Sequence, residues 1–200
     1  MRAGETGDPG AVRRTRLTPE REGELYEAVL DLLREAGYDS LTMEAVAARS
    51  RSSKATLYRQ WRTKPQLVAA ALRHAKPFTL DDLDTGTLAG DLYEMARRAG
   101  EGKKDLALVR AVAPAVRHDP DLADAMRKAL VEPELEVMRA ILGRAAARGE
   151  IPADSPAREF LPHMWAGAMF ARPLVEQREP DTEYLRRYLD AVVLPALTRE

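Results

Sequence analysis

The stretch that decides the fold runs from Thr42 to Trp61 and reads TMEAVAARSRSSKATLYRQW. Thr42 suits the N-cap of a short helix, and Glu44 lies near the positive end of that helix dipole. Residues 49–52 lack apolar periodicity and predict a turn, after which a second short helix begins at Ser53. Two short helices joined by a tight turn and closed by an aromatic residue predict a helix-turn-helix.

Helical signals continue on both sides of this motif. Thr18 suits an N-cap, and the helical apolar face that follows it ends at Gly37, a residue typical of the left-handed position after a helix. Thr63 and Gln66 match a capping box that opens a fourth helix. Apolar residues recur at helical spacing throughout the rest of the chain, and no segment alternates with period two. The sequence therefore predicts an all-α fold.

Composition divides the 200-residue chain into three parts. Residues 1–17 carry glycine and proline without apolar periodicity, so we expect a disordered basic tail. Residues 18–77 hold the helix-turn-helix, and Lys76-Pro77 is the predicted boundary. Residues 78–200 predict a larger helical domain, and the length is sufficient for one or two domains.

The formal net charge is -1, from 31 basic and 32 acidic residues, which taken alone argues against a nucleic-acid partner. The charge is polarised, however. Residues 1–77 hold 14 basic and 10 acidic side chains, and residues 78–200 hold 17 and 22. A run of basic residues can be a solvated surface, but here it coincides with the helix-turn-helix, which favours contacts to phosphates. Between residues 45 and 77 there is no acid, and the bases are Arg49, Arg51, Lys54, Arg59, Arg62, Lys64, Arg73 and Lys76.

Several functional classes are disfavoured by what the sequence lacks. The absence of cysteine excludes disulfides, zinc fingers and thiol nucleophiles, and the three histidines belong to no metal motif, so no metal or cofactor is expected. Glu159 and His163 are four apart and lack the partners of a di-iron bundle, so a helical-bundle enzyme is disfavoured. No apolar run approaches the ~18 residues of a membrane span, and no secretory core opens the chain, which predicts a soluble cytoplasmic protein.

The motif and its flanks resemble the TetR/AcrR family of transcriptional regulators, over about residues 18–75. The matching features are Gly37-Tyr38, Leu41-Thr42, Val46-Ala47-Ala48, the segment from Ser53 to Arg59, Trp61, Lys64 and Leu67. The resemblance implies a homodimer that places the third helix of each subunit in the major groove of a palindromic operator. It also implies a repressor that releases double-stranded DNA when a small-molecule effector binds the larger helical domain.

The resemblance also assigns DNA contacts to particular residues. Thr42 would cap the second helix against a phosphate, and the third helix would face the groove with Ser53, Lys54 and Thr56. Tyr58 and Lys64 would bind phosphates, since helix N-termini attract anions. Two alternatives stay open, because Tyr58 can be a core aromatic and Arg59 either contacts DNA or is solvated. The three arginines of the tail, Arg13, Arg14 and Arg16, either reach the minor groove or stay free in solution.

The chain departs from the family pattern in the turn. The family usually has glycine where Arg51 stands and a buried aliphatic residue where Ser52 stands. A left-handed turn position costs a non-glycine residue ~1 kcal/mol. Either Arg51 and Ser52 add contacts to DNA, or the turn is looser and the change has no function.

The carboxy-terminal part offers candidates for an effector pocket and a dimer interface, although Met and aromatic residues at helical spacing are more often plain core. The pocket candidates lie on the middle helices: Met95, Leu106, Val109, Met126, Leu130, Met138, His163, Met164, Trp165 and Phe170. A four-helix bundle of two subunits would use the last two helices, through Phe160, Leu161, Ala168, Leu185, Tyr188, Leu189 and Val192. A helical DNA-binding or partner-binding protein without an effector remains the alternative. The sequence leaves open the effector, the operator and whether the protein represses or activates.

Overall fold

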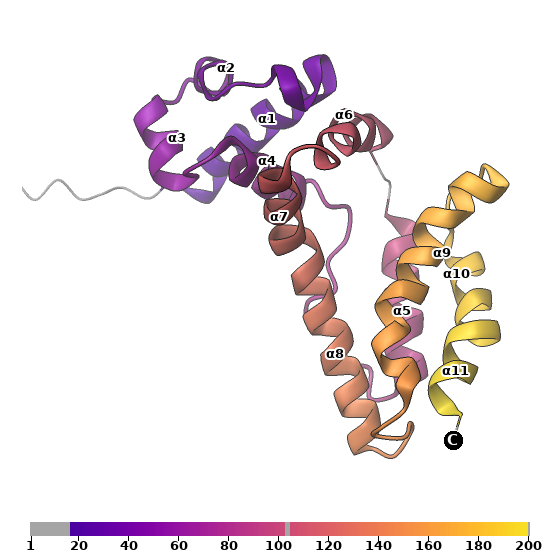
Figure 1. The fold of residues 1–200 in the computed structure, drawn as a ribbon. Coiled ribbons are helices and arrows are strands. Elements are labelled where there is room, and N and C mark those ends of the chain that lie inside the picture. The colour runs from indigo at the N-terminus through magenta and orange to yellow at the C-terminus, as the bar shows by residue number, and fades with distance from the viewer. Residues whose placement is uncertain (1–16, 103–104, 200) are drawn as a thin grey trace, which may run out of the picture.

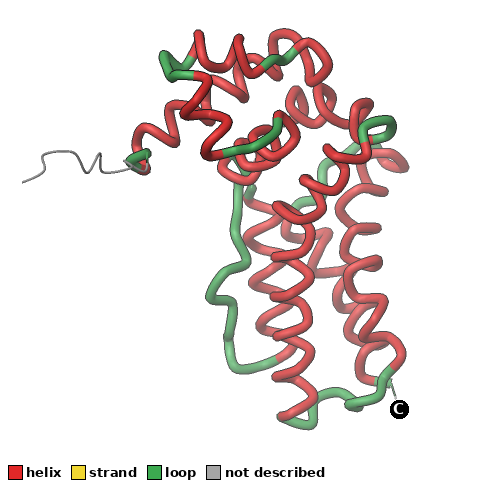
Figure 2. Tube along the Cα trace, turned by 60° about the vertical axis from the view of Figure 1, so that its left-hand side comes forward, coloured by secondary structure: helices red, strands yellow, loops and turns green. Residues whose placement is uncertain are grey.

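A computed structural model describes residues 17–102 and 105–199, and all regular structure in these ranges is helical, which confirms the all-α prediction (Figure 1). The tail up to residue 16, with its three arginines, lies outside the described residues. The helices form two bundles joined at one end (Figure 2). The first contains α1 (Pro19–Ser40), α2 (Met43–Arg49), α3 (Lys54–Gln60) and α4 (Lys64–His74). The second contains α5 (Leu88–Glu101), α8 (Glu132–Ala147), α9 (Leu161–Glu176), α10 (Thr182–Tyr188) and α11 (Leu194–Thr198).

The helices of the first bundle begin where the sequence predicts. Each N-cap hydroxyl accepts a hydrogen bond from the backbone N–H three residues later, which satisfies one of the free donors of the first turn. The four caps are Thr18 (3.3 Å), Thr42 (3.1 Å), Ser53 (3.1 Å) and Thr63 (3.4 Å). Gly37 has a φ of 75°, so the left-handed position predicted near the end of the first helix is confirmed.

The core of the first bundle extends beyond residue 77. Leu25, Leu33 and Leu57 are fully buried there together with side chains from α6 (Leu106–Val116) and α7 (Pro120–Met126). The contributions from these two helices are Leu108, Val112, Ala115 and Leu122. The first core therefore draws on residues from both sides of the predicted boundary at Lys76-Pro77, which follows the end of α4.

A single rod of helix links the two bundles. It runs from α7 through a short π-helix, η1 (Arg127–Val131), into α8. Pro133 lies in the first turn of α8, directly after η1, and the rod continues through it. Proline lacks the N–H for an i→i−4 bond and is best tolerated in a first turn. A second π segment, η3 (Leu189–Val193), joins α10 to α11, and a 3₁₀ turn, η2 (Pro156–Phe160), precedes α9.

The second bundle has its own core, to which the long connection between α4 and α5 contributes Leu80 and Leu83. This connection is held by the carboxylate of Asp91, which is fully buried. Asp91 accepts hydrogen bonds from the backbone N–H of Thr85 (2.6 Å) and from the guanidinium of Arg144 on α8 (3.1 Å). A buried charge is tolerated because it is paired and hydrogen-bonded. Among the described helices, none is both long and apolar enough to cross a bilayer.

Candidate nucleic-acid interface

The turn between α2 and α3 adopts the Schellman geometry. The N–H of Ser52 donates to the carbonyl of Ala47 (2.9 Å), and the N–H of Arg51 donates to the carbonyl of Ala48 (3.3 Å). Arg51 has a φ of 51° and so occupies the left-handed position that favours glycine. Its side chain is exposed, whereas Ser50 is buried and Ser52 is partly buried.

The helix α3 is almost uncovered by the rest of the molecule. Leu57 is its one buried residue, and Trp61, which follows α3, is buried against Tyr26 of α1, with the two rings edge to face 5.6 Å apart. Trp61 is therefore a core aromatic. Tyr58 is 48% exposed, so the interpretation of Tyr58 as a core residue does not hold. A helix with one buried anchor presents nearly its whole surface to a partner.

The small polar residues at the start of α3 form a compact group. The hydroxyls of Ser53 and Thr56 lie 2.9 Å apart, while the Ser53 hydroxyl also caps the helix. Ser53 is exposed and Thr56 partly buried. Thr42 is exposed at the start of α2 and uses its hydroxyl as the cap of that helix. Serine and threonine hydroxyls in such positions can bond to phosphate oxygens or base edges.

The eight bases between residues 45 and 77 differ in their surroundings, and half of them have partners within the chain. Arg49 pairs with Glu35 (2.6 Å), and its hydrogen bond lowers the pKa of that carboxyl below the ordinary range. Lys54 pairs with Glu44 (2.8 Å) and lowers the Glu44 pKa in the same way. Both pairs are exposed, so each contributes little to stability and is weakened by salt. Lys76 pairs with Glu134 of α8.

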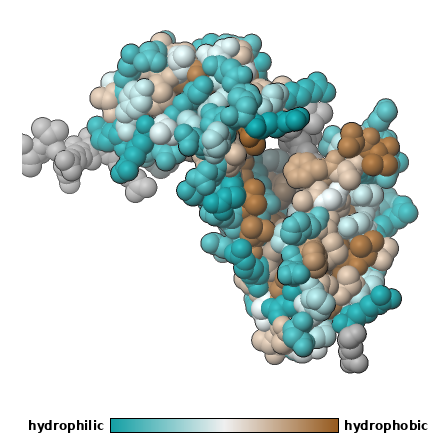
Figure 3. Space-filling model, in the orientation of Figure 1, coloured by the Kyte–Doolittle hydropathy of each residue, from teal (hydrophilic) through white to brown (hydrophobic). Residues whose placement is uncertain are grey.

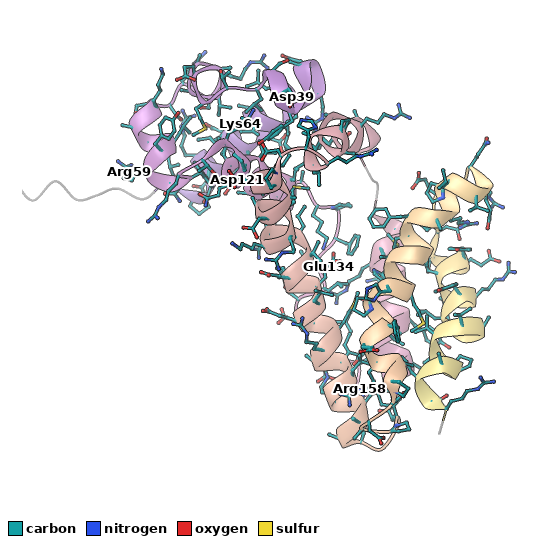
Figure 4. All side chains as sticks on the ribbon, viewed as in Figure 1. Asp39, Arg59, Lys64, Asp121, Glu134 and Arg158 are labelled. Carbon is teal, nitrogen blue, oxygen red and sulfur yellow. The ribbon has the colours of Figure 1, made fainter. Side chains whose placement is uncertain are left out.

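The other four cations of this run remain available, three of them in α3 or beside it and Arg73 in the last turn of α4. Within the described residues, no ion pair or side-chain hydrogen bond holds Arg59, Arg62 or Arg73, and the same is true of Arg51. Arg59 lies at the outer side of α3 (Figure 4). Unpaired cations beside an exposed helix suit contacts to a polyanion, because no internal partner competes with the phosphates.

Lys64 is not free for a phosphate in this conformation. Its ammonium donates to the backbone carbonyl of Tyr38 (3.1 Å) and lies over the Tyr38 ring, 4.1 Å from the ring centre. Figure 4 shows Lys64 within the first bundle. The Tyr38 hydroxyl in turn donates to Asp119 (2.7 Å), the N-cap of α7. Lys64 thus joins the start of α4 to the end of α1 and, through Tyr38, to α7.

The residues predicted to form an effector pocket do not gather around one cavity in the described part of the chain. Leu130 lines a pocket of about 160 Å³ between the end of α4, η1 and α8. The side chains of Leu106 and Val109 lie outside the described residues. His163 and Phe170 are exposed, and Met126 packs against the first core. The remaining four lie in or against the second core: Met95, Met138, Met164 and Trp165.

The residues predicted to form a dimer interface also separate into two sets. Four of them are used by packing within the subunit and have no surface left for a partner: Leu161, Ala168, Leu185 and Leu189. Tyr188 packs partly against the same core. Phe160 and Val192 are exposed. The apolar face of a helix can pack in the core of a subunit or at an interface between subunits, and the sequence does not distinguish the two. Here most of the apolar face of α9 and α10 packs in the core of the subunit.

The structure adds residues that the sequence analysis did not assign to the interface. Arg62, which follows α3, belongs to the acid-free run, which could have indicated it. Arg21 of α1 donates to the carbonyls of Ser50 and Arg51 in the turn. It lies 29 residues before Ser50, so no local sequence pattern could have indicated this contact.

A capped α2, a tight turn and an exposed α3 with unpaired arginines in it and beside it define a helix-turn-helix DNA-binding protein with a helical second bundle. Residues 25–71 match the family described as bacterial regulatory proteins, tetR family. Residues 82–192 match the tetracyclin repressor-like C-terminal domain. The chain belongs to the TetR family of helix-turn-helix transcriptional regulators.

Known proteins of similar sequence and fold agree with this assignment. An uncharacterized HTH-type transcriptional regulator of Mycobacterium tuberculosis is 36% identical over 90% of this chain and 89% of its own. The DNA-binding transcriptional repressor TetR of Mycobacteroides abscessus is 36% identical over 87% of this chain and 92% of its own. The solved structure of the flavonoid-responsive regulator FrrA is similar in fold, with a TM-score of 0.67 at 22% identity over 90% of this chain and 96% of that chain.

Proposed function

We propose that the protein is a homodimeric repressor that binds a palindromic operator and is released from it by a small-molecule effector. The observation that carries the proposal is the exposure of α3, whose one buried residue is Leu57. Among the described residues, Arg51 before α3, Arg59 on it and Arg62 just after it have no internal partner, and a short exposed helix in a helix-turn-helix is suited to the major groove. The relative from Mycobacteroides abscessus, which is named a DNA-binding transcriptional repressor, supports repression over activation.

The proposed DNA contacts follow the exposure of the side chains. Ser53, Lys54 and Thr56 would face base edges, and Thr42 and Tyr58 would contact the backbone. Unpaired arginines, Arg51 and Arg59 among them, would add phosphate contacts, with Ser52 beside them in the turn. Lys64 would reach a phosphate only by leaving the carbonyl of Tyr38, so its contribution depends on the state of the α1–α7 contact. Binding to the chromosome would place the protein in the cytoplasm.

The proposed dimer uses apolar surface that the subunit leaves uncovered. Three side chains near the end of α9 are among the most exposed large apolar residues described: Phe170, Leu174 and Val175. Figure 3 shows apolar surface gathered at this end of the second bundle. Exposed apolar patches commonly mark protein interfaces. Phe160 of η2 and Val192 of η3 would extend the interface, and a two-fold axis would match a palindromic operator.

The proposed effector response depends on the contribution of α6 and α7 to the core of the first bundle. Because α6 and α7 contribute to the first core, a ligand that shifts them would also disturb the helix-turn-helix. An effector releases DNA when it binds a DNA-incompetent conformation more tightly than the DNA-bound one. The flavonoid-responsive regulator of similar fold supports a response to small molecules in this architecture. The proposal requires no metal or cofactor.

The DNA-binding part is tested by selecting binding fragments from a random pool and from the region upstream of the gene. We expect a palindrome whose half-sites lie ~34–36 Å apart, bound by two chains. Arg59→Ala should weaken binding, whereas Arg97→Ala should not, because Arg97 of α5 pairs with Glu94 and Glu101 away from the motif. Failure of the wild-type chain to bind any fragment selectively would refute the proposal.

The effector part is tested by a thermal-shift screen of small molecules. A ligand that binds only the folded protein raises its melting temperature by mass action. We expect at least one such ligand also to lower operator affinity. Ligands that stabilise the protein without changing DNA binding, across the screen, would favour a DNA-binding protein without an effector.

A further inference from the structure

We infer that Arg21 is a positioning residue for DNA binding, because its guanidinium holds the turn of the helix-turn-helix in the left-handed conformation that Arg51 occupies. The inference rests on the proposed presentation of α3 to DNA. Through Arg21, α1 would hold the turn between α2 and α3, although α1 lies outside the helix-turn-helix motif. Three observations carry it: the conformation of the turn, the contacts of Arg21, and the weak attachment of α3.

The conformation of the turn is unfavourable for the residue that occupies it. Arg51 stands at the position after the C-cap of α2, with a φ of 51°. Glycine is the residue that adopts this conformation without a steric penalty. The hydrogen bonds of Ser52 to Ala47 and of Arg51 to Ala48 show that the turn is fully formed despite the arginine. A contact that stabilises this conformation would offset the cost.

Arg21 supplies such a contact from outside the motif. One nitrogen of its guanidinium, Nη2, donates both to the carbonyl of Ser50 and to the carbonyl of Arg51 (3.2 Å for the latter). Ser50 is only 5% exposed, and besides Arg21 its carbonyl accepts a long hydrogen bond from the Ser52 hydroxyl (3.5 Å), so loss of the guanidinium would leave a poorly satisfied acceptor. A cation at the C-terminal end of α2 also suits the helix dipole. Nη1 pairs with Glu24 and so orients the guanidinium.

The turn matters for DNA binding because few contacts besides it hold α3. These are the buried side chains of Leu57 and Trp61 and the exposed pair of Lys54 with Glu44. Ser53 caps α3 two residues after Arg51, so the direction of α3 relative to α2 depends on the backbone of residues 50–53. Loss of the Arg21 contact would let the turn relax and would misplace the side chains that face the groove.

A double-mutant cycle tests this role with the full chain: wild type, R21A, R51G and the double variant are titrated with a selected operator by fluorescence anisotropy. Glycine at position 51 removes the strain of the left-handed conformation, so the contact between Arg21 and the turn should matter less in the R51G background. We expect R21A to weaken binding roughly tenfold when Arg51 is kept and less than about threefold when it is combined with R51G. R97A serves as the matched control and should leave affinity unchanged. Equal losses in the two backgrounds would overturn the inference.

The salt dependence of binding separates positioning from direct contact. If Arg21 acts through the turn, R21A keeps the wild-type slope of log affinity against log salt. If Arg21 binds a phosphate, the slope falls by about one contact, and the positioning role is overturned. We also expect R51G alone to raise the melting temperature and to weaken operator binding.

Thermal unfolding of the same four proteins decides the question if R51G abolishes operator binding altogether. If R21A lowers the melting temperature less in the R51G background than in the background that keeps Arg51, the positioning role of Arg21 is supported. An equal loss in the two backgrounds overturns it. Failure of the positioning role differs from failure of the proposed function, because the latter would appear as a wild-type chain without selective DNA binding.

Discussion

Replacing Leu122 by alanine tests whether α7 is part of the core that carries the helix-turn-helix. Leu122 lies on the link between the bundles, yet its side chain is fully buried in the first core. Truncation of a buried leucine to alanine costs ~2–5 kcal/mol, because it loses burial and leaves a cavity. The free energy of unfolding of a domain is typically only ~5–15 kcal/mol, so this loss is a large fraction of the total stability. For a chain of this size the melting temperature should fall by roughly 2–4 °C per kcal/mol.

The assay pairs thermal unfolding by circular dichroism with operator binding measured at rising temperature. We expect Leu122→Ala to lose operator binding at temperatures where the wild type still binds. Val131→Ala is the matched control, since Val131 lies on the same rod but is 46% exposed and should change stability by less than ~1 kcal/mol. A Leu122→Ala protein that has the melting temperature of the wild type and keeps its operator affinity would refute the place of α7 in the first core.

Three further predictions follow from the same contacts. A fragment of residues 17–77 should lack cooperative unfolding in calorimetry, because α6 and α7 complete its core; a sharp transition would contradict this. Tyr38→Phe should destabilise the protein by about 1 kcal/mol at pH 7 by removing the bond to Asp119. Hydrogen bonds from the backbone N–H of Leu122 and from the Tyr38 hydroxyl hold the Asp119 pKa below its ordinary value. The contribution of that carboxylate is present above the unfolded pKa of ~3.9 and is lost at lower pH, so wild type and variant should converge in acid melts. Replacing both Phe170 and Leu174 by serine should give a monomer in analytical ultracentrifugation, and an unchanged dimer would exclude this patch as the interface.

Local signals in the sequence predicted the first bundle well. Thr42, Ser53 and Thr63 are N-caps in the structure because capping depends on residues within one helical turn. The left-handed position predicted at Gly37 is also a local feature, and Gly37 has a φ of 75°. The departure from the family pattern at Arg51 also coincides with a left-handed residue in the structure.

Contacts between distant segments could not be predicted in this way. The apolar face of α6 indicates burial but not which core receives it, and it packs against α1 instead of joining the second core. The same ambiguity explains why Leu161 and Leu185, predicted at a dimer interface, lie inside the subunit. The position of a cation in a basic run does not indicate its partner within the chain, such as the carbonyl of Tyr38 for Lys64, and the phosphate contact of Lys64 stays a prediction.

The central claim is that α3 reads DNA sequence. It is tested most directly by measuring affinity for a selected operator and for a scrambled duplex at one fixed salt concentration, with wild type and Thr56→Ala. The account predicts that the wild type prefers the operator by ~10³-fold or more, and that the variant loses part of this preference while its affinity for the scrambled duplex stays the same. Equal affinity of the wild type for both duplexes, or an unchanged preference in the variant, would contradict it.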